Sequence, residues 1–386
     1  MRLDIVQRWR VGRAGGTRSV AESGSGCYNL YLHIKLIKQL ITRRDRRASS
    51  AGGLEIARGG NARQSGIALI TALLVVALAS IAAAAILSAA NIAIHRAGNL
   101  QDSEKAWWYA DGVESWVRTI LERDVKDNST DSFRDAWAKP VDYLPVDEGY
   151  VRGRIEDLQG RFNLNNFGDP DKTNFEIDVA IFERLLQNID GADPSLARPL
   201  ADAIRDWVDK DSDPTGFDGA EDSEYLSHDP PYRTPNRPMA SVSEVLAVKG
   251  MTRELYDKLT HCASSKSGPI SCITVLPVFP TAINLNTAPE PLLRALSKQP
   301  TAALSAFLLS RDTKPLEAAA DAFNAPPAGF LTAADGVTQK MVTAQSSFFE
   351  LRAEVFIGSG RLALYSFYWR SSQGAAIVLG RSTDIE

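Results

Sequence analysis

The most apolar part of the chain is an uncharged run over residues 67–94. At a rise of 1.5 Å per residue, a helix over this run would be about 42 Å long, whereas the hydrocarbon core of a bilayer is about 30 Å thick. The run is also too long for the apolar part of an ordinary secretory signal, which has about 7 to 15 residues. The pattern therefore predicts one membrane-spanning helix.

Helical periodicity continues past the apolar run. Apolar residues recur there at intervals of three and four, at Tyr109, Val113, Trp116, Val117 and Ile120. Charged residues lie between them, which is the pattern of an amphipathic helix with one buried face. We therefore expect a single helix from residue 67 to about residue 123, followed by a turn-rich break at 127–130. Its second half should pack against a folded domain.

Strand periodicity dominates the carboxy-terminal end. Apolar and charged residues alternate over residues 349–357, and two further candidate strands follow at 362–370 and 375–380. Such runs predict an antiparallel meander whose apolar side covers the amphipathic helix. A shorter pair of strands, 150–157 and 160–164, is expected in the same layer. A long amino-terminal helix packed on an antiparallel sheet belongs to the α+β class.

The middle of the chain has a helical and acidic character. Four segments carry apolar periodicity after a serine, threonine or aspartate, and they are residues 176–188, 195–209, 242–248 and 253–259. Because helices often begin at such capping residues, we expect a large helical domain inserted between the elements of the sheet domain.

These patterns divide the chain into five parts. Residues 1–66 form a leader, a disordered amino-terminal extension, or a segment that precedes the true translation start. Residues 67–94 form the membrane half of the long helix. The sheet domain comprises residues 95–167 and 281–386, the second part containing a helix and the meander. The inserted helical domain, with its acidic loop, comprises residues 168–280.

Charge is distributed unevenly along the chain. Residues 1–66 contain thirteen Lys and Arg and four Asp and Glu, whereas the remaining residues contain thirty basic and forty-three acidic side chains. Basic residues before a membrane helix favour an orientation with the amino terminus inside. We therefore expect the acidic body in the periplasm or outside the cell.

The boundary between the basic segment and the apolar run is a candidate processing site. Arg63, Gln64, Ser65 and Gly66 come directly before Ile67. This junction resembles the site at which type IV prepilins are cut, and cleavage between Gly66 and Ile67 would leave the whole apolar helix on the mature chain. The other interpretation is a simple single-pass anchor in which Gly66 has no special role.

Two of the three cysteines lie close together. Cys27 falls in the leader, whereas Cys262 and Cys272 enclose a short polar loop. In an oxidising compartment these two form a candidate disulfide, which would stabilise the fold by about 2 to 3 kcal/mol. Two free thiols are the alternative, and no cysteine and histidine spacing in the sequence is typical of a zinc site.

The densest group of charged side chains lies at residues 206–225. Eight carboxylates occur within nineteen residues, and the candidate ligands among them are Asp209, Asp211, Asp213, Asp218, Glu221 and Asp222. Like charges at this density repel unless they are solvated or share a cation, and Ca²⁺ takes about six to eight oxygen ligands. We therefore predict a calcium loop, with a solvated acidic loop as the alternative. It is not an EF-hand, because Pro214 stands where that loop needs glycine and Ala220 where it needs glutamate.

Four segments together resemble one known family. They are DLQGRFNLN at residues 157–165, DWVDKDSDPTGFDGAEDSEY at 206–225, SEVLAVKG at 243–250 and INLNTAPEPLL at 283–293. In this order, and after a prepilin-like junction, they resemble protein K, a minor pseudopilin of type II secretion systems. The resemblance extends from about residue 63 to the carboxy terminus and leaves residues 1–62 outside it.

The resemblance implies a fold, a location and partners. The fold would be a type IV pilin-like helix and sheet with an inserted helical domain, anchored once in the bacterial inner membrane with its body in the periplasm. Prepilin peptidase would cleave before Ile67 and methylate the new terminus. The mature chain would cap the tip of the pseudopilus beside minor pseudopilins I and J, contact other pseudopilins and the inner-membrane platform, and support assembly initiation and protein export. Calcium would bind within residues 209–222.

One residue departs from the general pilin pattern. Counting Ile67 as the first mature residue, the fifth is Thr71, where most pilins have a glutamate that pairs with the amino terminus of the subunit above. A carboxylate within a bilayer costs about 2.5 kcal/mol or more and is retained only for a partner. A tip subunit has no subunit above it, so Thr71 favours a capping role. The alternative is a membrane helix with no role in a fibre.

A DNA-binding function is less consistent with the sequence. Residues 243–250 and 283–288 also resemble helix-hairpin-helix modules of competence receptors, which would make the chain a membrane-anchored DNA-binding protein. However, Gly250 is followed by Met251 and Thr252 rather than by a second glycine, and an acidic body repels a polyanion. We expect no nucleic-acid partner.

We also expect no enzymatic activity. Three histidines remain after processing, at His95, His228 and His261, and none lies near a nucleophile motif. The sequence has no glycine-rich phosphate loop of the kind that secretion motors use.

Overall fold

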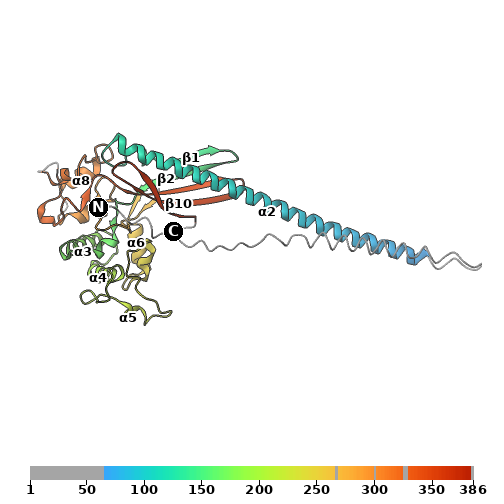
Figure 1. Cartoon of the computed structure of the whole chain (residues 1–386), viewed down its shortest axis with the longest axis horizontal. Coiled ribbons are helices and arrows are strands. Elements are labelled where there is room, and N and C mark those ends of the chain that lie inside the picture. Colours follow the sequence, from blue (N-terminus) through green and yellow to red (C-terminus); the bar gives the residue numbers. More distant parts are fainter. Residues whose placement is uncertain (1–64, 266–267, 300, 325–328, 384–386) are drawn as a thin grey trace, which may run out of the picture. The chain divides into compact units, whose positions relative to one another are not determined.

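The computed structural model describes residues 65–265, 268–299, 301–324 and 329–383 (Figure 1). Residues 1–64 of the predicted leader, including Cys27, lie outside the described residues. The chain divides into two units, one up to Ala84 and one from Ala85 onwards, and each is described by itself.

Helix α2 (Ser65–Asp127) contains the predicted apolar run. None of the residues in its most apolar stretch is buried, and the helix is long and apolar enough to cross a membrane. The prediction of one continuous helix is confirmed. The helix ends at Asp127, where the predicted turn-rich residues begin.

Five strands form the main sheet, and every neighbouring pair is antiparallel. In spatial order they are β1 (Val141–Val146), β2 (Gly149–Asp157), β9 (Phe348–Ile357), β10 (Gly360–Arg370) and β11 (Ala376–Ser382). The predicted carboxy-terminal meander is therefore confirmed. Strand β2 joins it by pairing with β9 over its whole length.

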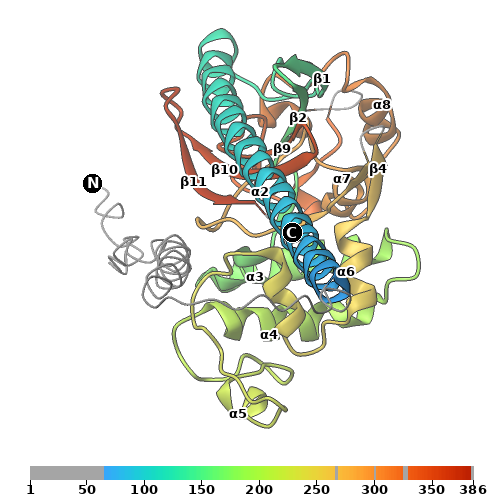
Figure 2. The same ribbon diagram turned by 90° about the vertical axis from the view of Figure 1, so that its right-hand side faces the viewer.

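The second half of α2 covers one face of this sheet (Figure 2). Leu121 packs in one cluster with Phe349 and Tyr368, and Ala110 packs in another with Val355. All five side chains are fully buried. Because alternate residues of a strand face the same side, the inward positions of β9 and β10 form an apolar surface that matches the helix. The predicted α+β class is confirmed.

The predicted strand at residues 160–164 is wrong as a member of this layer. Only β3 (Phe162–Asn163) is a strand there, and it pairs in parallel with β6 (Ile273–Thr274). The chain then enters the 3₁₀ helix η1 (Leu164–Gly168), whose first turn is capped by the side chain of Asn163. The edge beside β2 belongs instead to β1, whose side chains are mostly exposed and show no apolar alternation.

The part of the chain between β2 and β9, which we call the inserted unit, is mainly helical. Its α-helices are α3 (Lys172–Gln187), α4 (Ala197–Val208), α5 (Asp222–Tyr225), α6 (Arg253–Thr260), α7 (Glu290–Leu296) and α8 (Ala302–Ser310). Its further 3₁₀ helices are η2 (Pro194–Leu196), η3 (Val242–Ala247), η4 (Ala319–Phe323) and η5 (Ala333–Asp335). Short ladders pair β4 (Ala263–Ser265) with β5 (Gly268–Ile270) and β7 (Ile283–Asn284) with β8 (Val342–Thr343). All four predicted helices are present, the third as a 3₁₀ helix.

One hydrophobic core holds the inserted unit together. It extends in sequence from Phe162 to Val342 and includes Leu292 and Leu296 of α7. Helix α7 packs against α3, although the sequence pattern groups residues after 280 with the sheet domain. Buried packing is thus continuous across residue 280, and the division of domains there stays a prediction.

Candidate functional site

The acidic loop connects α4 to α5 in the inserted unit (Figure 1). Asp209 is the carboxy-terminal cap of α4, and Glu221 directly precedes the first residue of α5. Carboxylate oxygens of Asp209, Asp211 and Glu221 all lie within 4.8 Å of one another. The loop therefore brings three of the six predicted ligands together, although Glu221 is distant from the other two in sequence.

Two buried oxygens of this acidic group have no hydrogen-bond partner among the described residues. They are Oδ1 of Asp209 and Oε1 of Glu221. The protein engages other oxygens of the group: Asp211 Oδ1 accepts a bond from the backbone N–H of Asp213 at 3.0 Å, and Glu221 Oε2 accepts one from Thr234 Oγ1 at 3.3 Å. Because buried polar atoms are nearly always partnered, Oδ1 of Asp209 and Oε1 of Glu221 are candidate ligand atoms for a cation.

The acidic group is electrostatically unfavourable without a counter-charge. Burial, and then the charge of Asp211, raises the pKa of Asp209 to about 6. Burial, and then the charges of Asp206 and Asp209, raises the pKa of Glu221 to about 7. Glu221 is only 4% exposed. A bound cation would lower both pKa values, because it favours the ionised carboxylates.

The donor atoms of the group fit a hard divalent cation. All of them are carboxylate oxygens. Such ligands suit Ca²⁺ or Mg²⁺, and Ca²⁺ accepts irregular arrangements of about six to eight oxygens. Asp209, Asp211 and Glu221 would hold the ion, which would supply positive charge and a cross-link between the end of α4 and the start of α5.

The other three predicted ligands lie outside this group of converging oxygens in the part of the chain that the structure describes. Asp222 pairs with Arg233 at 2.5 Å and accepts hydrogen bonds from Thr234. Asp213 is exposed and contributes its backbone N–H to Asp211. Asp218 lies near Asp202 instead. Burial raises the pKa of the Asp202 carboxyl, and the negative charge of Asp218 raises that pKa further.

Sequence reasoning missed the residue that shapes the loop, Asp206 of α4. Its fully buried carboxylate accepts hydrogen bonds from the backbone N–H groups of Thr215 at 2.9 Å and Ala220 at 2.7 Å. A side chain at Gly219 would collide with the same carboxylate. These contacts return the loop to the end of α4 and so bring Glu221 beside Asp209. No local pattern identifies Asp206, because its donors come from distant backbone.

A second group of acids has a protein counter-ion. Asp124, Asp131 and Asp135 also place oxygens within 4.8 Å of one another. Arg370, which is 2% exposed, pairs with Asp124 at 2.8 Å and with Asp131 at 2.5 Å. Since the guanidinium supplies the positive charge, this group is a buried ion-pair network that fastens the end of α2 to the end of β10.

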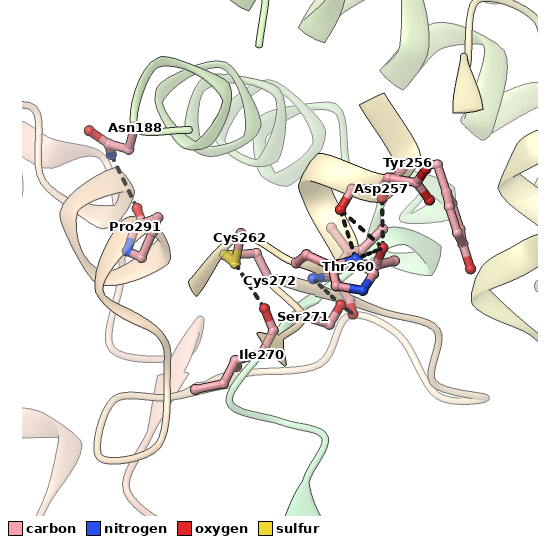
Figure 3. Close-up of a disulfide and its surroundings, with 11 residues drawn as sticks. Asn188, Tyr256, Asp257, Thr260, Cys262, Ile270, Ser271, Cys272 and Pro291 are labelled. Atoms are coloured by element: carbon pink, nitrogen blue, oxygen red, sulfur yellow. Dashed lines mark hydrogen bonds between the residues drawn. A yellow bond between two sulfur atoms is a disulfide. The ribbon is translucent and has the colours of Figure 1, made fainter. Parts of the chain in front are cut away.

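The predicted pairing of Cys262 with Cys272 is present as a disulfide (Figure 3). The hairpin of β4 and β5 lies between the two cysteines and places Ala263 opposite Ile270, so the flanking cysteines meet. Cys272 is fully buried, and its backbone N–H donates to the oxygen of Leu259 at 2.9 Å. The disulfide therefore closes the end of α6 onto the core of the inserted unit.

The candidate processing site lies at the start of α2. Gly66 and Ile67 are both helical, and Ile67 is exposed. The hydroxyl of Thr71 donates to the backbone oxygens of Ile67 and Ala68, each at 3.0 Å. Thr71 is thus satisfied within its own helix, whereas a carboxylate at this position would require a partner. Cleavage and methylation at Ile67 stay predictions.

The segment that resembles a DNA-binding turn uses its backbone internally. The N–H of Lys249 donates to the hydroxyl of Tyr225 at 3.2 Å, and that of Met251 donates to the oxygen of Val248 at 3.2 Å. Phosphate-gripping turns present such N–H groups to the ligand. Gly250, whose φ is +84°, therefore forms a structural turn that packs against Leu200 in the core of the inserted unit.

Comparison with known proteins gives the family. A family model described as "Type II secretion system (T2SS), protein K" matches residues 160–264, which include the acidic loop. The type II secretion system protein K of Aeromonas hydrophila is 33% identical over 336 residues, which cover 83% of this chain and 97% of the relative. The chain belongs to the protein K family of type II secretion systems.

Two further similarities agree with this family. Protein K of Pseudomonas aeruginosa is 31% identical over 326 residues, which cover 82% of this chain and 92% of the relative. A chain in the crystal structure of the GspK-GspI-GspJ complex from the type 2 secretion system of enterotoxigenic Escherichia coli has a TM-score of 0.65 and 26% identity, covering 75% of this chain and 100% of that chain. The resemblance based on four short segments is therefore confirmed.

Proposed function

We propose that this chain is the minor pseudopilin at the tip of the periplasmic pseudopilus of a type II secretion system. There it would help to initiate assembly and support protein export across the outer membrane, without catalysing a reaction. Its partners would be minor pseudopilins I and J, the other pseudopilins and the inner-membrane platform. The observation that carries the proposal is the likeness to a chain of the GspK-GspI-GspJ complex.

Two features of the chain support a terminal position. The inserted unit adds a second hydrophobic core to the helix and sheet, and such bulk is best accommodated at an end of a fibre, where neighbours lie on one side only. Thr71 offers no charge to a subunit above, and its hydroxyl is satisfied within α2. Helix α2 would anchor the chain in the inner membrane, with the acidic body in the periplasm.

Intact-mass measurement tests the processing step. Co-expression with prepilin peptidase should shorten the chain to a product that begins with N-methylated Ile67. A Gly66→Leu variant is the matched control and should stay at full length, because a bulky residue replaces the glycine at the cleavage site. An unchanged mass of the wild-type chain would contradict processing and would indicate a simple membrane-anchored protein.

Labelling of isolated pseudopili tests the tip position. Gold-labelled antibodies raised against the inserted unit should mark one end of each fibre in electron micrographs. Antibodies against the most abundant pseudopilin provide the control and should mark the whole length. Regular labelling of the shaft by the first antibody would contradict a capping role.

We also propose that the acidic group binds Ca²⁺ through Asp209, Asp211 and Glu221. The convergence of their oxygens and the two buried oxygens left without a partner support this assignment. The ion would join the end of α4 to the start of α5 and so stabilise the inserted unit.

Thermal unfolding of the full chain in detergent tests the calcium site. At a Ca²⁺ concentration one hundred times the dissociation constant, binding should stabilise the fold by about 2.7 kcal/mol relative to chelator. Asp209→Asn should lose most of this shift. Asp213→Asn, which changes a nearby exposed acid outside the group, should retain it. If calcium does not shift the Tm of the wild-type chain, the calcium proposal is wrong. If the two variants lose the calcium-dependent shift equally, the assignment of Asp209 as a ligand is wrong.

A further inference from the structure

Another oxygen beside the acidic group is left without a partner. Oδ1 of Asn236 is buried and accepts no hydrogen bond from any residue that the structure describes. Asn236 lies in the long connection between α5 and η3, outside the acidic loop. Its Nδ2 donates to the backbone oxygen of Asp211 at 3.2 Å. Because a backbone carbonyl can only accept, the nitrogen must face Asp211, and this fixes the orientation of the amide.

The backbone at Asn236 is held in a conformation that most residues avoid. Its φ is +46°, and within the described ranges Glu148 is the one other non-glycine residue with a positive φ. Asparagine tolerates the left-handed region better than most residues, but the conformation still costs energy, and such residues gather at ligand sites. The fold thus positions this side chain beside Asp211 despite local strain.

The same connection is fastened to the acidic loop at a second point. The hydroxyl of Thr234 donates to Oε2 of Glu221 at 3.3 Å and to Oδ1 of Asp222 at 3.0 Å. Thr234 therefore lies at the Glu221 end of the acidic group, and Asn236 lies at the Asp211 end. The segment between them runs along the group of converging carboxylates and can contribute to it.

We propose that Asn236 Oδ1 is a neutral ligand of the cation held by Asp209, Asp211 and Glu221. This inference rests on the calcium proposal above. Three carboxylates, two of which already give an oxygen to a protein donor, leave Ca²⁺ short of its about six to eight ligands. An amide oxygen adds a ligand without adding negative charge to a group that already repels itself.

The consequence is that the ion fastens two separate segments of the chain. It would hold the acidic loop to the connection between α5 and η3, and opening of that connection would then depend on calcium. Arg233 offers a way to measure this, because its side chain is 68% exposed and the peptide bond to Thr234 is a trypsin site. The next basic residue, Arg237, precedes Pro238 and is a poor trypsin site.

Three variants of the full chain in detergent separate a ligand from a structural residue. Asn236→Gly removes the oxygen and accommodates the positive φ, so it avoids added strain. Asn236→Asp keeps an oxygen but loses the donor to Asp211. Asn188→Ala is the matched control, because its Nδ2 also donates to a single backbone carbonyl, that of Pro291, at 3.1 Å. Calcium affinity is measured by calorimetry, and the rate of cleavage after Arg233 is measured with calcium and with chelator.

We expect Asn236→Gly to weaken calcium affinity about tenfold, equal to about 1.4 kcal/mol, and to lose most of the calcium-dependent protection after Arg233. Asn236→Asp should bind at least as tightly as the wild type, and Asn188→Ala should match it. Wild-type affinity in Asn236→Gly would overturn the ligand role, and so would equal weakening in the Gly and Asp variants. A wild-type chain that binds no Ca²⁺ would instead overturn the calcium proposal itself and, with it, this inference.

Discussion

Replacing Arg370 by methionine would test what holds the end of α2 to the sheet. The guanidinium pairs with Asp124 at 2.8 Å and with Asp131 at 2.5 Å, and it donates to the backbone oxygen of Ser346 at 2.8 Å. It also lies over the ring of Phe349, 4.5 Å from the centroid. Methionine fills much of the same volume without charge. The variant would therefore leave two buried carboxylates without their counter-ion.

The expected loss of stability is large. Removing one partner of a buried ion pair costs about 3 to 5 kcal/mol. At about 2 to 3 °C per kcal/mol for a folded body of this size, the Tm of Arg370→Met should fall by about 6 to 15 °C near pH 8. Asp124→Asn and Asp131→Asn added to this variant should recover part of the loss, because no buried charge then remains unpaired.

The loss should also depend on pH. In the wild-type chain, burial, and then the charge of Asp131, raises the pKa of Asp124 to about 7. A carboxyl whose pKa is raised on folding stabilises the fold at acid pH, and it loses that contribution as pH rises from about 4 through 7. Without Arg370 the carboxyl of Asp124 would hold its proton more tightly, because no positive charge would then favour its ionised form. The variant should approach the wild type at pH 5 and fall furthest behind at pH 8.

Thermal unfolding of the full chain in detergent, followed by near-ultraviolet circular dichroism at several pH values, measures this effect. Arg361→Met is the matched control, because Arg361 is an arginine of the same strand whose side chain is 59% exposed and pairs with Glu354 at 2.5 Å. An exposed pair contributes less than about 1 kcal/mol. Equal losses in the two variants at every pH would refute the claim that Arg370 neutralises buried acids.

Two further predictions concern the inserted unit. Burial, and then the charge of Asp169, raises the pKa of Asp178 to about 8, and its Oδ2 has no hydrogen-bond partner within the described ranges. This raised pKa contributes stability at acid pH that is lost as pH rises from about 4 through 8. Asp178→Asn should therefore raise the Tm at pH 8 and change it little at pH 5. An equal shift of the Tm at the two pH values would contradict a raised pKa of Asp178. Replacing Cys262 and Cys272 by alanine should cost about 2 to 3 kcal/mol, and thermal unfolding with and without reductant would check this, since an unchanged wild-type Tm in reductant would show that the bond contributes nothing.

The sequence by itself determined the helices and strands whose apolar residues repeat regularly within one continuous segment. The apolar run of α2, the alternation of β9 and the capped helices α3 and α6 each depend on one continuous segment, so their local patterns predicted them. The acidic region and the cysteine pair were visible for the same reason, because their residues gather in sequence. Strand β1 was missed, since an exposed edge strand has no apolar face to produce a pattern.

Only the tertiary structure decided which of these charged residues act together. Six acids in the loop look equivalent in sequence, yet Glu221 converges with Asp209 while its neighbour Asp222 pairs with Arg233. Asn236 reaches the backbone oxygen of Asp211, and Arg370 reaches the carboxylate of Asp124, from segments that are distant in the chain. A local pattern records how one segment is buried, whereas the partner of a side chain depends on how the backbone between distant segments folds, and that is settled only when the core has packed.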